Sequence, residues 1–328
     1  MASIRERSGV WQARVRRKGY PDEVASFSSK AEAQRWSRSV EAGMDQGSYT
    51  SIRDAQDLLL ADILRRYMRE VTPSKRGAKR EAEGIEFMLR QKIAAYSMAN
   101  LVPAVVASYR DERLKTVAAG TIIRELSILS GIITHARKEW GLPTSNPCAL
   151  VRKPPTPQGR NRLLTESEES ALLEELKPIR RRSPWMVPLV MLALESAMRR
   201  GELLALRWEN VNFNAQTALL PLTKNGSARI VPLSKKAVAI LEALPNCGNI
   251  GVIFPISYMT LSNCFVDACS RAKITNLRFH DLRHTATSRL AEKLPNVIEL
   301  AHVTGHSTIQ MLKRYYHPKA EALAQKLG

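Results

Sequence analysis

The stretch HVTGHSTIQMLKRYYHP at residues 302–318 and the shorter HDLRH at residues 280–284 concentrate the reactive side chains of this sequence. Histidine exchanges protons near neutral pH, tyrosine carries a nucleophilic hydroxyl, and arginine keeps its charge under ordinary conditions. A helix that begins near residue 280 would place His280, Arg283 and His284 on one side and apolar residues on the other. These two stretches predict a polar site beside a helical core.

Upstream, the sequence SAMRRGELLALRW at residues 196–208 follows a strongly apolar stretch, Trp185 to Glu195. That stretch is long enough for a buried helix. Arg199 and Glu202 are three residues apart at the predicted start of the next helix, where a simple ion pair would contribute only about 0.2–0.5 kcal/mol. Because the pair falls between two apolar helices, we expect Arg199 to bind a ligand.

Two apolar strands, Thr217 to Leu222 and Ala228 to Leu233, are predicted between these motifs. The Asn225-Gly226 dipeptide that separates them is a strong hairpin signal. Lys224 then lies at the hairpin tip, where a lysine is ordinarily only solvated.

The spacing His-x3-His occurs twice, at residues 280–284 and 302–306, and is also found among zinc ligands. Neither pair is accompanied by glutamate or cysteine in the arrangement of a metalloprotease or a zinc finger, and Gly305 interrupts the second pair. The four cysteines form no CxxC pair of a zinc ribbon or disulfide framework. We therefore expect neither a metal ion nor another cofactor.

The chain has 328 residues and a formal net charge of +19. The excess of basic over acidic residues is +3 in residues 1–50, +5 in residues 51–150 and +11 in residues 151–328. An excess of this size points to nucleic acid first and to an anionic membrane surface only a distant second. Its spread along the whole chain favours a protein that wraps around its polyanion over a globule with a basic arm. We find no apolar run of transmembrane length and no signal-peptide core, and so expect a cytoplasmic, nucleoid-associated protein.

Residues 1–51 are predicted to form a small β-sheet packed against one helix. Apolar and polar side chains alternate over residues 10–15, and Ser29 to Glu32 has the spacing of a capping box. Arg14 and Arg16 lie on the polar face of this strand and are candidates for contact with a DNA groove. A solvated edge sheet is the competing interpretation.

Residues 55–150 have the periodicity of an all-α unit. The four predicted helices are one that buries Leu60, Ile63, Leu64 and Tyr67, a second over Ala82 to Tyr96, a third over Ala104 to Thr116, and a fourth that is capped by Thr121 and ends before Gly141.

Residues 151–162, VRKPPTPQGRNR, contain three prolines and no acidic residue. This composition is typical of a semi-rigid linker. Its basic residues are candidates for contact with DNA, although a solvated hinge would have the same composition; they are Arg152, Lys153, Arg160 and Arg162. Residues 163–328 follow as a further domain.

In order and spacing, the motifs resemble the catalytic domain of tyrosine recombinases, the phage integrase family, over roughly residues 160–320. SAMRRGELLALRW resembles the first arginine motif of the family, HDLRH its His-x-x-Arg-His motif, and HVTGHSTIQMLKRYYHP its Gly-His and nucleophile motifs. Residues 55–150 resemble the core-binding domain, and residues 1–51 less closely the arm-binding domain. The implied fold is multidomain: a small β-sheet plus helix, an all-α core-binding domain, and a mixed α/β, mostly helical catalytic domain at residues 163–328.

Position by position, the resemblance implies a catalytic set of Arg199, Lys224, His280, Arg283, His306 and Tyr315, supported by Glu202 and His284. The family places its nucleophile nine residues after the Gly-His histidine, which selects Tyr315 over Tyr316. Ala197 and Thr304 replace the glycine and the leucine that are usual in the family, and this puts the loop geometry in question.

The chemistry of the family implies a role for each of these side chains. Arg199 and Arg283 would bind the non-bridging oxygens of a five-coordinate phosphorus, and His306 would hydrogen-bond to the same phosphate. His280 would take the tyrosine proton, and Lys224 would protonate the leaving 5′ oxygen. The product, a 3′-phosphotyrosine with a free 5′-hydroxyl, conserves bond energy without metal or ATP.

The leading hypothesis is a site-specific DNA recombinase that acts as a homotetramer on two double-stranded DNA sites. It would integrate and excise a phage or mobile element, or invert DNA, since the motifs also resemble those of shufflon-type invertases. A DNA-bending accessory protein or directionality factor is a candidate partner. The alternatives are a type IB topoisomerase, which relaxes DNA as a monomer, and a non-catalytic DNA-binding protein.

Overall fold

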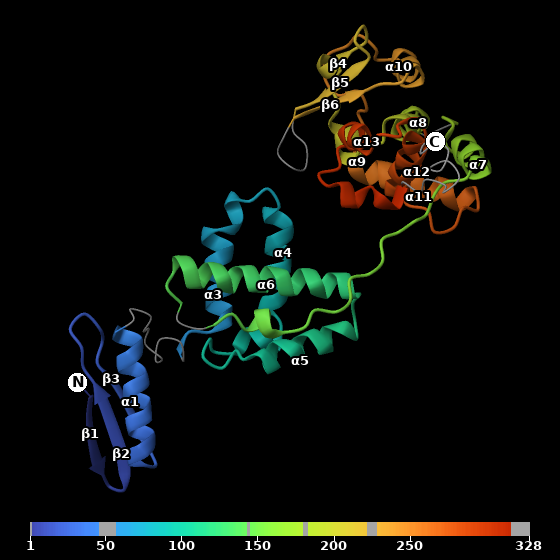
Figure 1. The fold of residues 1–328 in the computed structure, drawn as a ribbon. Helices are drawn as coiled ribbons and strands as arrows, with labels where there is room; N and C mark the ends of the chain where they lie inside the picture. The colour runs from blue at the N-terminus through green and yellow to red at the C-terminus, as the bar shows by residue number, and fades with distance from the viewer. Residues whose placement is uncertain (1, 46–56, 143–144, 180–182, 222–227, 316–328) are drawn as a thin grey trace, which may run out of the picture. The chain divides into compact units, whose positions relative to one another are not determined.

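The chain divides into two compact units, Met1–Gln158 and Gly159–Gly328 (Figure 1). The computed structural model describes residues 2–45, 57–142, 145–179, 183–221 and 228–315, with the backbone alone at residue 314. The finer division into residues 1–51, 55–150, 151–162 and 163–328 stays a prediction.

The first unit begins with a three-stranded antiparallel sheet and one helix: β1(Ala2–Arg7), β2(Val10–Val15), β3(Glu23–Phe27) and α1(Lys30–Asp45). Ala13 and Val15 are buried, as the alternation in β2 predicts. The hydroxyl of Ser29 accepts a hydrogen bond from the backbone N–H of Glu32 at 3.3 Å, so the predicted helix start is confirmed. Strand β1 escapes prediction because most of its side chains are exposed and show no apolar face.

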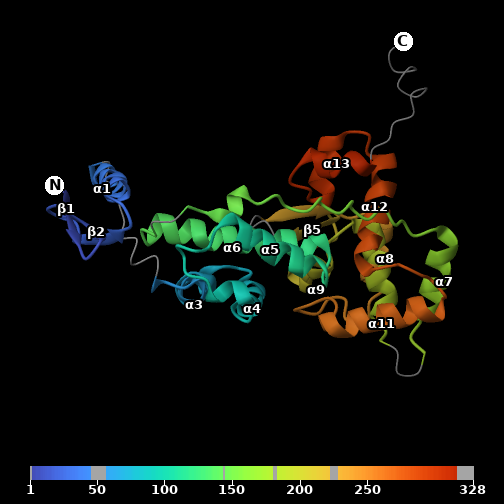
Figure 2. The ribbon, with the colours of Figure 1, turned by 90° about the horizontal axis from the view of Figure 1, so that it is seen from below.

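Four helices follow: α3(Leu60–Glu70), α4(Ala78–Leu89), α5(Pro103–Leu114) and α6(Ala119–Glu139). Short 3₁₀ turns lie between or after them: η1(Thr72–Ser74), η2(Lys92–Ala95) and η3(Pro147–Leu150). The long helix α6 packs against α3 and α5 (Figures 1 and 2). Its predicted face, which includes Leu126, Leu129 and Ile133, is buried.

Three helix boundaries predicted for this part are wrong. The second helix was expected over Ala82 to Tyr96, but α4 begins at Ala78 and ends at Leu89. Ile93 continues the apolar pattern from the 3₁₀ turn η2, where it is buried, so periodicity alone extends the helix too far. Thr121 does not cap α6, because the extended residue before the helix is Ala118, whose carbonyl accepts the N–H of Thr121.

The second unit is mostly helical. Its helices are α7(Glu166–Leu176), α8(Met186–Ser196), α9(Arg200–Ala205), α10(Lys235–Glu242), α11(Tyr258–Arg271), α12(Phe279–Lys293) and α13(Val297–Thr304). Its antiparallel sheet has the order β4(Val211–Asn212), β5(Thr217–Leu220) and β6(Arg229–Pro232), and its 3₁₀ turns are η4(Trp208–Asn210), η5(Ile309–Met311) and η6(Lys313–Tyr315).

Helix α8 lies at the centre of this unit and contacts α7, α10, α11 and α12. Leu189, Val190 and Leu192 are fully buried there, and each such side chain stabilises the fold by about 1.5–3 kcal/mol. The predicted buried helix is confirmed. Because α8 and α12 are packed rigidly together, the residues at their ends have fixed positions.

Strands β5 and β6 pair as the predicted hairpin, with Leu219 opposite Ile230. Residues 222–227, which include Lys224, lie outside the described residues. The sequence after Gly305-His306 also predicts a helix that ends at residues 313–318. This prediction is wrong, since up to residue 315 the described chain forms only the short turns η5 and η6. Gly305 ends α13 in a left-handed conformation, and Thr308 is extended.

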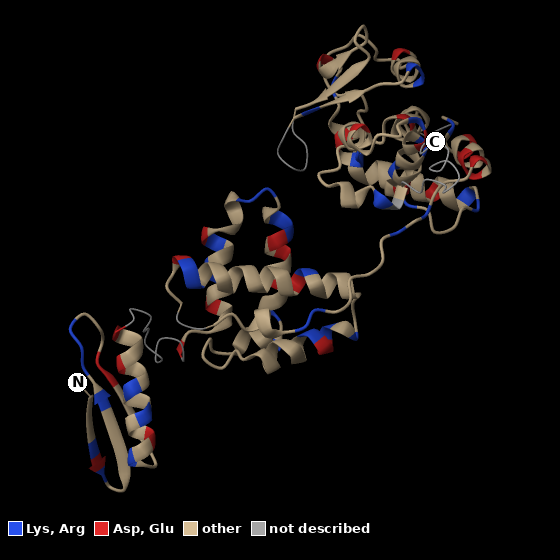
Figure 3. Ribbon diagram, in the orientation of Figure 1, with Lys and Arg blue, Asp and Glu red and all other residues tan. Residues whose placement is uncertain are grey.

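Lysine and arginine residues occur on both units, and acidic residues are dense on α7 (Figure 3). This distribution agrees with the spread of charge along the sequence. Over the described residues, no helix is both long enough and apolar enough to cross a membrane.

Candidate active site

The site is built where two helices end in left-handed turns. Helix α8 is followed by Ala197 with φ 51°, and α13 by Gly305 with φ 68°. Each turn presents its carbonyl oxygen to an arginine: Arg283 Nη1 donates to Ala197 O at 2.5 Å, and Arg199 Nη2 donates to Gly305 O at 2.7 Å. Alanine adopts this conformation less easily than glycine, yet the turn at Ala197 is formed.

Arg199 is held by the first turn of α9. Its backbone N–H donates to Glu202 Oε2 at 2.8 Å, and its Nη1 donates to Glu202 Oε1 at 2.8 Å. Burial alone would raise the pKa of Glu202, which is 7% exposed, but the Arg199 N–H and the guanidinium of Arg229 lower the pKa below its ordinary value. Glu202 is therefore a fixed anion that orients Arg199.

Arg283 lies in α12 and is 5% exposed. Burial, and then the charge of Arg199, lower its pKa to about 10, so the side chain remains a cation at neutral pH. Its Nη2 lies 3.5 Å from Nε2 of His306. The pattern predicted for α12 is confirmed in that Arg283 and His284 face the same site.

His306 follows the left-handed turn at Gly305. Its Nδ1 lies 2.6 Å from the hydroxyl oxygen of Thr304, the last residue of α13. Its ring centroid is 6.1 Å from that of Tyr315. The turn thus places His306 between Arg283 and the candidate nucleophile.

The hydroxyl of Tyr315 forms a hydrogen bond with Nδ1 of His284, and the two rings are stacked with centroids 5.7 Å apart. The His280 ring meets the His284 ring edge-on at 5.2 Å. Partial burial, and then the charge of Arg283, lower the pKa of His280 below its ordinary value. The structure therefore places His284 against the tyrosine hydroxyl, where the sequence predicts the proton acceptor to be His280.

Arg229 on β6 is a member of the site that the sequence analysis misses. Its Nη2 donates to Glu202 Oε2 at 2.7 Å and its Nη1 to Val303 O at 2.6 Å, and the side chain is 10% exposed. The feature that could have identified it is the alternation of side chains along the strand. Arg229 lies on the same face as the buried Val231, while Ile230 points outward. Arg229 therefore links the sheet to α9 and α13.

Comparison with known proteins agrees with this arrangement. Residues 162–322 match the phage integrase family. The shufflon-specific DNA recombinase of Escherichia coli is 39% identical over 277 residues, which cover 82% of this chain and 71% of that protein. A putative integrase/recombinase of Haemophilus influenzae is 33% identical over 341 residues, which cover 100% of this chain and 91% of that protein.

The chain belongs to the phage integrase family. It is a tyrosine site-specific recombinase, as the motifs predict, and the multidomain, mostly helical fold is confirmed. Among solved structures, a lambda integrase tetramer bound to a Holliday junction superimposes with a TM-score of 0.65 and 19% identity, over 97% of each chain. At that identity the likeness concerns the fold alone.

In this tyrosine recombinase, most of the implied catalytic residues meet in one place. Those in contact within the site are Arg199, Glu202, His280, Arg283, His284, His306 and Tyr315. Lys224 and Tyr316 lie outside the described residues. Within the described residues, no three His, Cys, Asp or Glu side chains form a group that could hold a metal ion.

The residues predicted to contact DNA have protein partners in the recombinase. Arg14 and Arg16 both form ion pairs with Asp22, at 2.6 and 2.7 Å. These pairs are exposed and contribute little to stability. Contact of Arg14 and Arg16 with DNA stays a prediction.

The four basic residues of the linker divide between the two units. Lys153 Nζ donates to Ser127 Oγ at 3.2 Å, and the carbonyl of Arg152 accepts a hydrogen bond from Arg110 at 2.7 Å. Arg162 forms an ion pair with Glu168.

Arg160 has a structural role. Its Nη2 donates to Asp281 Oδ2 at 2.9 Å, and Asp281 accepts the backbone N–H of Arg278 at 2.8 Å, which caps the start of α12. Arg160 therefore anchors the helix that carries Arg283 and His284. Its contact with DNA stays a prediction, as do those of the other basic residues of the linker.

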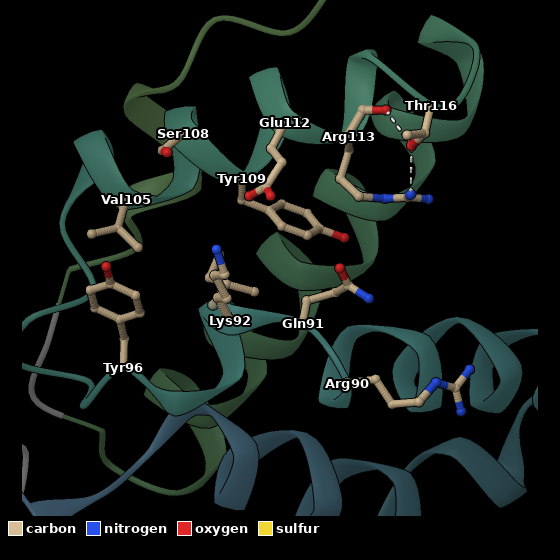
Figure 4. A pocket seen from close by; sticks show the side chains of 11 residues that line it. Arg90, Gln91, Lys92, Tyr96, Val105, Ser108, Tyr109, Glu112, Arg113 and Thr116 are labelled. Carbon is tan, nitrogen blue, oxygen red and sulfur yellow. Dashed lines mark hydrogen bonds between the residues drawn. The ribbon is translucent and has the colours of Figure 1, made fainter.

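A cavity of about 390 Å³ lies in the helical part of the first unit, lined by residues that include Arg90, Lys92, Tyr96 and Tyr109 (Figure 4). Arg113 also lines the cavity, and its guanidinium donates hydrogen bonds to Glu125 and to the hydroxyl oxygen of Thr116. The groups in this cavity do not resemble the cluster around Tyr315, whose described members all lie in the second unit.

Proposed function

We propose that this recombinase cleaves a DNA strand by attack of the Tyr315 hydroxyl oxygen on phosphorus. The bond between that oxygen and phosphorus forms as the bond to the 5′ oxygen breaks, which yields a 3′-phosphotyrosine and a free 5′-hydroxyl. The observation that carries the proposal is the hydrogen bond between Tyr315 and His284, in the same cluster as Arg283 and His306.

The proton of the nucleophile passes to the histidine pair of α12. A tyrosine has an ordinary pKa near ~10, so it requires an acceptor during attack at neutral pH. His284 Nδ1 contacts the hydroxyl directly, and His280 lies against His284. A neutral His280 favours the transfer, because a second cation beside His284 would oppose it.

The charge that develops on the phosphate is met by Arg199 and Arg283. Each has two N–H groups in the contacts described above, and a guanidinium has five, so donors remain for the non-bridging oxygens. His306, once it is protonated on both ring nitrogens, contributes a third contact. Lys224, on the hairpin between β5 and β6, is proposed to give its proton to the leaving 5′ oxygen.

Exchange of strands requires two DNA sites and several protomers. The likeness to the lambda integrase tetramer on a Holliday junction, over 97% of this chain, supports a homotetramer on double-stranded DNA. The N-terminal sheet favours integration and excision of a mobile element, carried out on DNA at the nucleoid. DNA inversion is the second candidate, favoured by the 39% identity to a shufflon-specific recombinase. The accessory factor stays a prediction.

Covalent trapping tests the chemistry. The full chain is incubated with nicked duplexes that tile the DNA flanking its gene, and the products are separated on a denaturing gel. We expect a protein–DNA adduct with wild type and with Tyr316→Phe, and none with Tyr315→Phe. Tyr316→Phe is the matched control because it also removes a single tyrosine hydroxyl from the same segment.

An adduct that survives Tyr315→Phe would overturn the assignment of the nucleophile. Wild type that binds these duplexes without forming an adduct would favour the non-catalytic alternative. A supercoiled plasmid with one site and a plasmid with two sites then separate relaxation by a topoisomerase from recombination. The orientation of the two sites distinguishes inversion from excision.

A further inference from the structure

The hydroxyl of Thr304 joins the end of α13 to the ring of His306. Thr304 is 0% exposed, and its Oγ1 donates to the carbonyl oxygen of Leu300 at 2.6 Å. The same oxygen lies 2.6 Å from His306 Nδ1. A leucine, the residue usual in the family at this position, could make neither bond.

The hydrogen-bond geometry decides which nitrogen of His306 carries a proton. A threonine hydroxyl has one proton, and the Leu300 carbonyl can only accept it. With its proton committed to Leu300, Oγ1 can only accept from the imidazole. Nδ1 of His306 must therefore be protonated.

The other side of the ring agrees with this assignment. In a neutral imidazole that is protonated on Nδ1, Nε2 carries a lone pair. Nε2 of His306 faces Nη2 of Arg283 at 3.5 Å, and a guanidinium can only donate. The contacts with Thr304 and Arg283 thus require the same tautomer.

The backbone of residues 301–306 fixes the position of the His306 Cα atom, from which the ring extends. Gly305 has φ 68°, and the N–H of His306 donates to Ala301 O at 3.1 Å, so the start of the side chain is held by α13. The contact at Nδ1 then limits rotation about the side-chain bonds. Position and tautomer are set by one short segment, residues 300–306.

We propose that Thr304 is a positioning residue that fixes the Nδ1–H tautomer of His306, so that Nε2 faces Arg283 and is the nitrogen that must gain a proton before His306 can donate to the scissile phosphate. The phosphate contact rests on the proposed function, whereas the tautomer does not. In metal sites, loss of the outer hydrogen-bond partner of a ligating histidine typically reduces activity about 10–100-fold. The same range is expected for cleavage when the Thr304 hydroxyl is removed.

The experiment compares Thr304→Val, which removes the hydroxyl with little change in shape, with Thr304→Ser, which keeps it. The full chain is labelled with ¹⁵N-histidine, and the His306 signals are assigned by their loss in His306→Asn. We expect the Nδ1–H tautomer in wild type and Thr304→Ser, and its loss in Thr304→Val. Single-turnover cleavage should fall about 10–100-fold in Thr304→Val and be largely retained in Thr304→Ser.

Thr287 offers a matched control. It is also fully buried, and its hydroxyl donates to the carbonyl four residues earlier, Arg283 O, at 2.7 Å. Thr287→Val therefore removes a helical hydroxyl bond of the same kind, one made to Arg283 O and not to the His306 ring, and it should keep the tautomer. Thermal melts report the stability of each variant.

Three results would overturn the proposal. They are a wild-type His306 protonated on Nε2 when neutral, an unchanged cleavage rate in folded Thr304→Val, and a Thr304→Ser variant as defective as Thr304→Val. If Thr304→Val fails to fold, the wild-type tautomer and the Thr304→Ser rate still decide. A wild-type chain that shows the tautomer but forms no covalent adduct would contradict the proposed function and leave the positioning role of Thr304 standing.

Discussion

Two arginine–carboxylate networks in this chain differ in their balance of charge. In the helical part, Glu125 binds Arg113 through both oxygens, at 2.8 and 3.2 Å, and accepts the hydroxyl of Tyr109 at 2.7 Å. Burial and the Glu125 carboxylate raise the pKa of Tyr109, so the hydroxyl stays protonated. One cation meets one anion, and a neutral donor completes the set.

The catalytic network has more cations than anions. Glu202 binds both Arg199 and Arg229. Arg283 lies close enough that the two arginines lower its pKa and Glu202 raises it. Among the described atoms, Arg229 Nε is buried and has no hydrogen-bond partner. A buried excess of positive charge is costly without an anion. The balanced network is suited to holding helices together, and the unbalanced one to binding a phosphate.

The largest expected effect comes from Arg199→Ala. Cleavage should fall about 10²–10³-fold, the usual cost of removing a fixed donor that stabilises transition-state charge. DNA affinity should change little, because that charge develops only during the reaction. Single-turnover cleavage and filter binding measure the two quantities. Arg207→Ala, at an exposed arginine paired with Glu209, is the control. Affinity that falls in parallel with the rate would assign Arg199 to ground-state binding.

Glu125→Gln should weaken folding without affecting chemistry. It leaves Arg113 without its carboxylate partner in a mostly buried site, at a cost of about 1–3 kcal/mol in the free energy of unfolding. Urea unfolding measures this change, and cleavage by the folded protein should match wild type. Glu112→Gln, at an exposed position, is the control. A large loss of cleavage rate in Glu125→Gln would contradict the distinction between the two networks.

Arg229→Met should reduce cleavage about tenfold, equivalent to about 1.4 kcal/mol. The variant keeps the Arg199–Glu202 pair but removes the link from β6 to Glu202 and Val303. Arg229→Lys, which retains the charge without the two-armed contact, should be intermediate. Single-turnover rates of the three proteins give the order. A wild-type rate in Arg229→Met would show that Arg229 contributes only through packing, and not through its charge or hydrogen bonds.

The smallest effect is on pH dependence. The ordinary pKa of histidine is about 6.5, and the pKa of His280 lies below that value. His280 is therefore neutral at pH 7 and becomes charged only in more acidic solution. Cleavage should therefore be nearly constant from about pH 8 down to about pH 6.5 and decline below that. His280→Asn should lack this part of the decline when rates are normalised to pH 8. A decline centred above pH 7 in wild type would contradict the neutral His280.

The sequence predicts this site well where residue type and helical spacing determine position. Arg199 with Glu202, and Arg283 with His284, lie in single helical turns, and the apolar faces of α8 and α12 are clear from periodicity. Arg229 is different, because its partners Glu202 and Val303 are 27 and 74 residues away. Its inward direction depends on how the sheet packs. From the sequence alone, the isoleucine of an Arg-Ile pair in a strand would be expected to point inward and the arginine outward.

Tertiary contacts also decide between similar side chains. His280 and His284 are both predicted to face the site, and only the position of η6 brings Tyr315 to His284. Thr304 looks like a departure from the usual leucine, but its hydroxyl meets His306 because of the turn at Gly305. The short turns η5 and η6 escape prediction because a left-handed residue and an extended Thr308 interrupt a helical pattern.

Gly305 leaves no room for a side chain. A Cβ atom there would lie 2.8 Å from both Cζ and Nε of Arg229, so even one methyl group would displace that guanidinium from Glu202 and Val303. The displacement would pass through Glu202 to Arg199, which itself donates to the Gly305 carbonyl. The three elements α9, β6 and α13 are thus joined in a closed ring of contacts. Replacing one hydrogen atom of Gly305 by a methyl group would therefore disturb both arginines that meet there.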